Sequence, residues 1–300
     1  MRKFVLLLLP MLICCTQNPS GQHKMEQKNY SKSFDGDLKS TTFGKDQKAG
    51  KYYDVRGIKM YVESYGQGEP ILLIHGNGGS ISNFLYQIPE FARHFKVIAV
   101  DSRAQGKSID KNDSLSYEMM ADDFADLLKQ MNTGPVHVLG WSDGGINALL
   151  LAQRHPDAVK KIAITGANIH PDASAFAANE WENMHKGFLA IEAKMKTPGA
   201  KTPEDSLSYK LQKLLAENPH IAPRELRNVQ APTLVIAGDH DMIATSHTVE
   251  IFENLPSAQL WIIPDCGHAT LVSHADTFNE KVLEFFREPF TKRKDSDRFF

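Results

Sequence analysis

Between Lys51 and Pro289 the sequence alternates short β-rich apolar runs with longer amphipathic ones. This alternation is typical of an α/β fold, in which helices cover both faces of a mostly parallel sheet. The run Ile71–Ile74 is continuously apolar, as expected of a strand that is buried on both faces. The eight predicted strands are 52–56, 59–65, 71–74, 97–100, 136–139, 162–165, 233–237 and 259–263. The first two are expected to form an antiparallel edge.

Amphipathic segments between these strands predict helices. In the second segment Met120, Phe124 and Leu127 repeat at three- and four-residue spacing, so one helix face is expected to pack on the sheet. The predicted helices are 82–94, 116–131, 143–155, 246–254 and 272–287. Residues 168–228 carry helical patterns without a strand between them, which predicts a helical cap inserted after the sixth strand. The folded body is expected at 51–290.

The N-terminus has the composition of a secretory signal. Arg2 and Lys3 precede an apolar run that is too short to span a bilayer. Leu12-Ile13-Cys14-Cys15 resembles a bacterial lipoprotein signal, and this resemblance implies that residues 1–15 carry the signal and that Cys15 is lipidated. Cys14 remains an alternative acceptor. The protein is then expected to be exported and lipid-anchored to a bacterial membrane, on the periplasmic or cell-surface side.

Residues 16–50 are polar and lack helical or strand periodicity, so we predict a flexible linker there. Residues 291–300 read as a charged, frayed tail. The formal net charge is −2 and the sequence has no basic stripe, so nucleic acid is not expected as a partner. Beyond the signal only Cys266 remains, so no disulfide is expected within the mature domain, and a packed loop residue is favoured over a nucleophile.

The motif Gly140-Trp141-Ser142-Asp143-Gly144 stands directly between a predicted strand and a predicted helix. A serine at such a turn has strained backbone angles that leave its hydroxyl exposed above the sheet, so Ser142 is the predicted nucleophile. A serine hydroxyl needs a base that is oriented by an acid. His268 follows the last predicted strand and Asp241 follows the strand before it. Both therefore lie at the carboxyl ends of strands, where open α/β sheets form their binding and active sites.

Several alternatives accompany this assignment. Asp239 is a rival for Asp241, although it is better placed to hold the turn through backbone amides. The N–H of Asp143 is one expected oxyanion donor, and the other is expected from the loop His75–Gly79, through Asn77 or Gly78. That loop also resembles a dinucleotide fingerprint, but Ile81 stands where the third glycine belongs.

At this point the sequence resembles the α/β-hydrolase superfamily over nearly all of Lys51 to Pro289. The resemblance is carried by His75-Gly76, Asp101-Ser102-Arg103, the Ser142 motif, Asp241 and His268, with Ala104 where the family usually has glycine. It implies an eight-stranded sheet and a serine esterase that forms an acyl-enzyme on Ser142, without cofactor or metal. A carbon–carbon bond hydrolase of ring-cleavage products and a non-catalytic ligand-binding protein remain alternatives.

Within the superfamily, the run from Gly140 to Leu149 and Thr165-Gly-Ala-Asn168 resemble the valacyclovir hydrolase (biphenyl hydrolase-like) group. This resemblance implies that Asp143 binds the α-ammonium of amino-acid esters. Alternatively, Asp143 only complements the helix dipole. Gly78 and Trp181 are further candidates for contacts to a small-molecule ester, and Met184 and Phe188 for an apolar cap wall.

Overall fold

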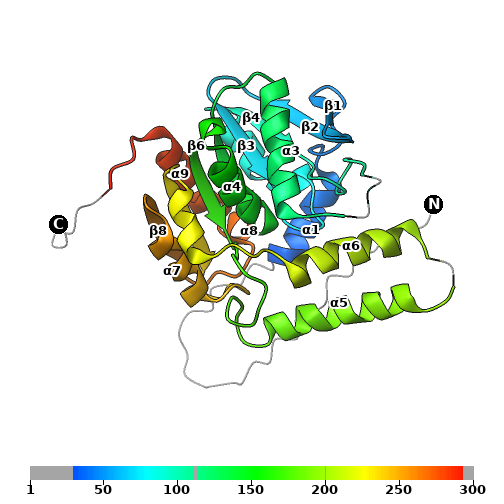
Figure 1. The fold of residues 1–300 in the computed structure, drawn as a ribbon. Helices are drawn as coiled ribbons and strands as arrows, with labels where there is room; N and C mark the ends of the chain where they lie inside the picture. The colour runs from blue at the N-terminus through cyan, green and yellow to red at the C-terminus, as the bar shows by residue number, and fades with distance from the viewer. Residues whose placement is uncertain (1–29, 111, 113, 200, 293–300) are drawn as a thin grey trace, which may run out of the picture.

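The computed structural model describes residues 30–110, 112, 114–199 and 201–292 and is built around one eight-stranded sheet (Figure 1). The strand order is β1-β2-β4-β3-β5-β6-β7-β8, with β1 and β2 antiparallel to their neighbours and the rest parallel. The strands are β1 Gly50–Val55, β2 Ile58–Tyr65, β3 Pro70–Ile74, β4 Lys96–Val100, β5 Val136–Trp141, β6 Val159–Thr165, β7 Thr233–Gly238 and β8 Ala258–Ile263. All eight predicted strands are confirmed, with ends that shift by up to three residues.

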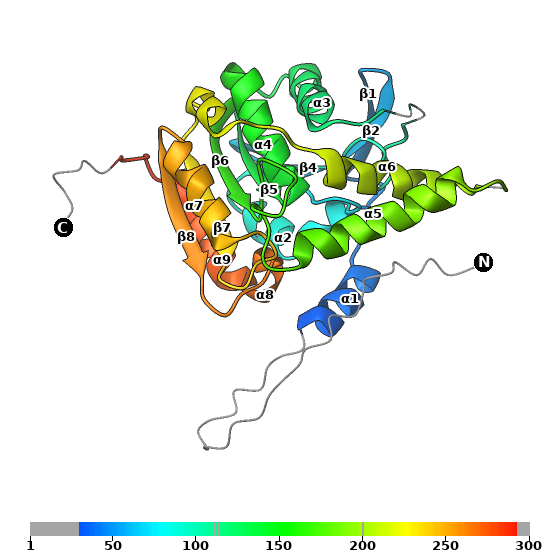
Figure 2. The ribbon, with the colours of Figure 1, turned by 60° about the horizontal axis from the view of Figure 1, so that its bottom comes forward.

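Helices cover both faces of the sheet (Figures 1 and 2). On one face lie α3 (Tyr117–Gln130), α4 (Asp143–Arg154) and α7 (Thr245–Asn254), and on the other lie α2 (Gln87–Phe91) and α9 (Ala275–Arg287). In β3, Leu72 and Ile74 pack toward the first face and Ile71 and Leu73 toward the second. The continuous apolar run of β3 therefore fills two cores at once, as expected for a central strand.

Two predicted helices are interrupted. The segment expected at 82–94 is a 3₁₀ turn, Ile81–Phe84, followed by the short α2. Pro89 lies in the first turn of α2, where its missing N–H removes no helical hydrogen bond, whereas a helix that began at residue 82 would need that N–H in its interior. The segment expected at 272–287 divides into α8 (Thr270–Ser273) and α9, because His274 between them has non-helical angles of φ −126° and ψ 37°.

The cap after β6 contains α5 (Glu180–Lys196), α6 (Pro203–Glu217) and a 3₁₀ helix at Pro223–Asn228. Helices α5 and α6 run side by side below the carboxyl ends of the strands (Figure 2). The cap expected at 168–228 thus consists of helices only within the described residues, apart from a single bridge between Phe176 and Ile243.

The prediction of a flexible linker at residues 16–50 is wrong for the second half of this segment. Residues Tyr30–Ser40 form helix α1, and β1 already begins at Gly50. Between them, the N–H groups of Gly44 and Asp46 donate to the Glu63 carboxylate at 2.7 and 2.9 Å. These residues are ordered by contacts to the body, which a local reading of polar sequence does not detect.

The signal predicted at 1–15, with Cys15, and the first half of the linker lie outside the described residues, as does most of the tail at 291–300. In the described part of the chain, no helix has the length and apolar content that a bilayer span requires.

Candidate active site

Ser142 lies in the turn between β5 and α4 with backbone angles of φ 55° and ψ −120°. Positive φ is rare for a residue with a side chain and costs of order 1–3 kcal/mol. The neighbouring glycines make the turn sterically possible. A Cβ on Gly144 would lie 1.9 Å from the Ile74 carbonyl oxygen, and one on Gly140 would lie 2.1 Å from the Gly144 carbonyl oxygen.

Ser142, His268 and Asp241 form a continuous series of hydrogen bonds. The Ser142 Oγ lies 3.0 Å from Nε2 of His268, and Nδ1 of His268 lies 2.7 Å from Oδ1 of Asp241. The three residues follow β5, β8 and β7, so the parallel sheet brings its carboxyl ends together at this point. The geometry permits proton transfer from the serine hydroxyl to the imidazole.

Asp239 and Asp241 have separate environments. Asp239 is exposed and accepts a hydrogen bond from the Cys266 N–H at 3.0 Å, so it holds the turn in the way the sequence suggested for the rival residue. Asp241 is buried and contacts the histidine. Its Oδ1 also accepts from the N–H of Ile243 at 3.0 Å, which fixes the carboxylate. Cys266 is buried in the same loop.

Burial lowers the pKa of His268, but the negative charge of Asp241 and its hydrogen bond outweigh this effect, with a further contribution from Asp143. The net result is a pKa raised above the ordinary histidine value of 6.5. A histidine with a raised pKa is a stronger base toward the serine proton.

The loop after β3 passes close above the serine. A Cβ built on Gly76 would lie 3.1 Å from the Cβ of Ser142. The N–H of Gly78 donates to Oε1 of Gln105 at 2.6 Å. Of the two loop amides predicted as oxyanion donors, Asn77 therefore stays the candidate, together with the N–H of Asp143. The latter opens helix α4, where N–H groups have no intrahelical acceptor.

Asp143 is a buried carboxyl at the edge of the site, with 2% of its surface exposed. Its Oδ2 accepts a hydrogen bond from Nδ2 of Asn77 at 2.9 Å. Burial raises its pKa to about 6, against smaller opposing effects of Asn77 and the Tyr117 hydroxyl. The carboxyl is therefore mostly ionised at neutral pH and becomes neutral in mild acid.

A cavity of about 480 Å³ opens onto Ser142. The polar groups at its base include Asn77, Gly78, Asp143 and His268. Its remaining wall is largely apolar and includes Phe34, Leu38, Phe176, Met184, Leu215 and Ile243. Gly78 and Met184 line the cavity, as the sequence suggested.

Two predicted contacts fall inside the cap instead. Trp181 stacks on His185 with ring centroids 4.6 Å apart and donates its indole N–H to the Pro171 carbonyl at 2.9 Å. Phe188 is buried and stacks on Tyr209. Neither residue lines the cavity, so their aromatic rings stabilise the cap rather than the substrate wall. The residues missed by sequence reasoning are Phe34 and Leu38, for which a four-residue apolar spacing was the available signal.

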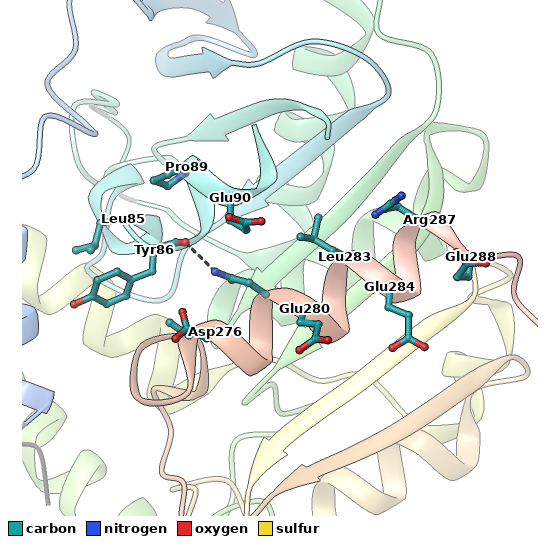
Figure 3. Close-up of a pocket in the computed structure, with 12 residues that line it drawn as sticks. Leu85, Tyr86, Pro89, Glu90, Asp276, Glu280, Leu283, Glu284, Arg287 and Glu288 are labelled. Atoms are coloured by element: carbon teal, nitrogen blue, oxygen red, sulfur yellow. Dashed lines mark hydrogen bonds between the residues drawn. The ribbon is translucent and has the colours of Figure 1, made fainter. Parts of the chain in front are cut away.

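A larger hollow of about 670 Å³ lies between α2 and α9 (Figure 3). Asn279 crosses it and donates to the Tyr86 carbonyl at 2.9 Å. Its charged rim consists of Glu90, Asp276, Glu280, Glu284, Arg287 and Glu288. The described residues that line it include no serine, cysteine or histidine, so this hollow offers no nucleophile and base.

Among the described residues, one group has ligand atoms close enough to hold a metal ion: His170, His247 and Glu250, within 4.8 Å of one another. Nε2 of His247 accepts a hydrogen bond from the Ile169 N–H at 3.0 Å, so the ring proton is on Nδ1 and faces Glu250 at 3.0 Å. Both ring nitrogens are thus engaged, and the group anchors the start of the cap to α7.

Comparison with known proteins agrees with this fold. A family model described as the alpha/beta hydrolase fold matches residues 69–188. Serine hydrolase BPHL of Mus musculus is 29% identical over 252 residues, which cover 78% of this chain and 84% of the mouse protein.

A second sequence relative and one solved structure are also similar to this chain. The 2-hydroxy-6-oxo-6-(2'-aminophenyl)hexa-2,4-dienoic acid hydrolase of Metapseudomonas resinovorans is 25% identical over 262 residues, 78% of this chain and 90% of that protein. A thermophilic esterase structure from Thermogutta terrifontis superposes with a TM-score of 0.67 at 23% identity, covering 81% of this chain and 99% of the esterase. The last likeness concerns the fold alone.

Proposed function

We propose that the chain cleaves small carboxylic esters through an acyl-enzyme on Ser142, in keeping with its α/β-hydrolase fold and its similarity to serine hydrolase BPHL. The observation that carries this proposal is the hydrogen-bonded series Ser142–His268–Asp241 at the base of an apolar cavity. Arrangements of this kind activate a serine hydroxyl for acyl transfer.

The proposed reaction has two halves. His268 takes the Ser142 proton while Oγ attacks the ester carbonyl carbon, and the N–H groups of Asn77 and Asp143 stabilise the resulting oxyanion. The intermediate collapses, the ester C–O bond breaks, and His268 protonates the departing alcohol. A water molecule deprotonated by His268 then attacks the acyl-enzyme and releases the acid. Loss of one oxyanion donor in such sites lowers kcat by roughly 10²–10³.

A panel of p-nitrophenyl esters, run on the wild type and on Ser142→Ala, tests the proposal. We expect measurable turnover by the wild type and a fall of at least about 10³-fold in kcat for the variant, because the nucleophile is missing. Equal turnover by both proteins would exclude Ser142 as nucleophile. No turnover of any ester by the wild type would instead favour a non-catalytic ligand-binding role.

Asp143 is the proposed binding group for a substrate ammonium. Its carboxyl lines the cavity beside Ser142, and one oxygen accepts from Asn77. An ammonium about 4 Å away would gain roughly 4 kcal/mol at an effective dielectric near 20, before desolvation. Because the pKa of Asp143 is about 6, this attraction should fade below that pH.

Amino-acid esters and their N-acetylated forms separate this role from a structural one. We expect wild-type kcat/KM to favour the free amines at pH 7.5 and to lose that preference near pH 5. Asp143→Asn should lose it at both pH values while retaining turnover of the acetylated esters. Equal kcat/KM of the wild type for the free amines and the acetylated esters would show that Asp143 only complements the helix dipole.

A carbon–carbon bond hydrolase is the second candidate, because the Metapseudomonas relative is named for a ring-cleavage type of substrate. The same serine, histidine and aspartate would serve it. Product analysis with a 2-hydroxy-6-oxo-hexadienoic acid distinguishes the two: cleavage to a carboxylic acid and a 2-hydroxydienoic acid, faster than any ester, would favour this candidate over the esterase.

For the location of the protein, we propose lipid anchoring at Cys15 outside the bacterial cytoplasm. The support is the resemblance of residues 12–15 to a lipoprotein signal. Expression of the wild type and Cys15→Ala, followed by detergent partition and mass measurement of the N-terminal peptide, tests it. An unmodified wild-type Cys15, or retention of the lipid by the variant, would rule out this acceptor.

A further inference from the structure

Helix α1 lies next to the candidate active site although it precedes the hydrolase body in sequence. Figure 2 shows it beside α8 and below the cap helix α5. Phe34 and Leu38 are four residues apart, so they share one face of α1. Both are half-buried and both line the cavity that holds Ser142 and His268.

Contacts to the body hold α1 at this place. The Tyr86 hydroxyl donates to Oδ2 of Asp37 at 2.6 Å, and the rings of Tyr86 and Phe34 have centroids 6.1 Å apart. After the helix ends, the Glu63 carboxylate receives the N–H groups of Gly44 and Asp46. The segment is therefore attached within its Phe34–Leu38 stretch and again after the helix ends.

Several apolar residues share the cavity with this face. Met184 of α5 and Leu215 of α6 come from the cap, and Val272 comes from α8, directly after the His268 loop. An ester held with its carbonyl at Ser142 can thus extend an apolar group between the cap and α1. Each methylene group that leaves water for such a wall improves binding by roughly a factor of four.

We propose that α1 forms a wall of the substrate cavity and that Phe34 and Leu38 select esters with an extended apolar group. This inference rests on the proposed esterase function for its kinetic consequence. It assigns a substrate-binding role to a segment outside residues 69–188, which the hydrolase family model matches.

The test uses the full chain with p-nitrophenyl acetate, butyrate and octanoate. In Phe34→Ala/Leu38→Ala we expect kcat/KM for octanoate to fall about tenfold or more, because both apolar contacts are lost, while acetate stays within about twofold. Leu38→Trp fills the cavity and keeps this helix face apolar. It should also lower kcat/KM for octanoate and leave kcat/KM for acetate unchanged. Lys39→Ala, an exposed position on the same helix, is the matched control and should change neither.

A binding measurement decides the inference even without turnover. In the Ser142→Ala background, methyl octanoate is titrated while tryptophan fluorescence, to which Trp141 contributes, is recorded. The affinity should be about tenfold weaker once Phe34 and Leu38 are alanine. Trp141 lines the same cavity. Unchanged affinity, or equal kinetic losses for all chain lengths, would overturn the role of α1. Absence of ester turnover with the expected binding loss would overturn the esterase proposal and leave the cavity wall intact.

Discussion

At the scale of single residues, the bond between Asp241 and His268 has the largest chemical consequence. It is the shorter of the two hydrogen bonds in the series, and it places the ring proton on Nδ1, so that Nε2 presents a lone pair to Ser142. Asp241 is itself fixed by the Ile243 N–H. The imidazole therefore has one orientation and one tautomer before substrate arrives.

Asp241→Asn should show this dependence in a pH profile of kcat/KM. A neutral amide removes the charge that raises the pKa of His268, so burial dominates and the pKa falls. Because turnover needs neutral His268, the acid limb of the profile should move to lower pH, while the plateau falls by about 10³–10⁴ as the tautomer is lost.

Asp239→Asn is the matched control for that experiment, because its carboxylate is exposed and bonds only backbone in the same turn. We expect its acid limb to stay in place and its plateau to change by less than about threefold, in line with a surface substitution. An acid limb that moves equally in both variants would show that Asp241 does not set the pKa of His268.

The sequence predicted which candidate side chains the structure brings together better than it predicted their surroundings. Ser142, Asp241 and His268 were found because each follows a strand, and parallel strands bring their carboxyl ends together whatever the detail between them. Trp181 was misplaced because its position depends on how the cap helices pack on each other. Asp143 was singled out from its place after Ser142. Its burial against Asn77 was not predicted, because this contact joins residues 66 positions apart in the sequence.

At the scale of elements, the loop after β4 carries a strained residue. Ala104 has φ 62°, a region that suits glycine. The loop is held nonetheless, because Arg103 pairs with buried Asp123 at 2.6 Å and Asp101 accepts from the N–H groups of Ile81 and Lys107.

Ala104→Gly should therefore stabilise the protein. Relief of the left-handed strain, about 1–2 kcal/mol, exceeds the entropy that glycine adds to the unfolded chain, which leaves a net gain of about 0.5–1 kcal/mol. Urea unfolding measures the gain. Ala193→Gly, at an exposed helical position of α5, is the control and should destabilise by about 1 kcal/mol. A loss of stability in both variants would contradict the strain at Ala104.

Elements were predictable where their own residues decide them. The central strands β3 and β7 are almost wholly apolar. Helices α3 and α4 begin at Tyr117 and Asp143, within one residue of the predicted starts. Helix α1 was missed because only Phe34 and Leu38 break a polar run, and the contacts that order it come from Tyr86 and α8. Tertiary packing, rather than propensity, decides such a helix.

At the scale of the whole molecule, a buried carboxylate is among the groups that join the N-terminal segment to the sheet. Glu63 on β2 accepts hydrogen bonds from the Gly44 and Asp46 N–H groups and from the hydroxyls of Tyr61 and Tyr65. Four donors converge on it, and its side chain is buried. Burial of this group is compensated only while the segment stays in place.

Glu63→Gln turns one acceptor oxygen into a donor and leaves part of this network unpaired. We expect a loss of about 2–4 kcal/mol in the free energy of unfolding, because buried donors lose their acceptor. Limited proteolysis should then cut within residues 30–49 before the body unfolds. Glu253→Gln, at an exposed helix position, should change stability by less than about 0.5 kcal/mol. Uncut residues 30–49 would show that α1 is held without Glu63.

The position of α1 also decides how the protein should be handled. A tag or fusion partner joined directly ahead of Tyr30 would begin about one helical turn from Phe34, which lines the cavity, so its bulk would lie near the bound ester. Helix α9 ends instead at the opposite edge of the sheet, where the Phe285 carbonyl accepts from Lys161 at the start of β6. Immobilisation, labelling and affinity capture therefore belong at the C-terminus.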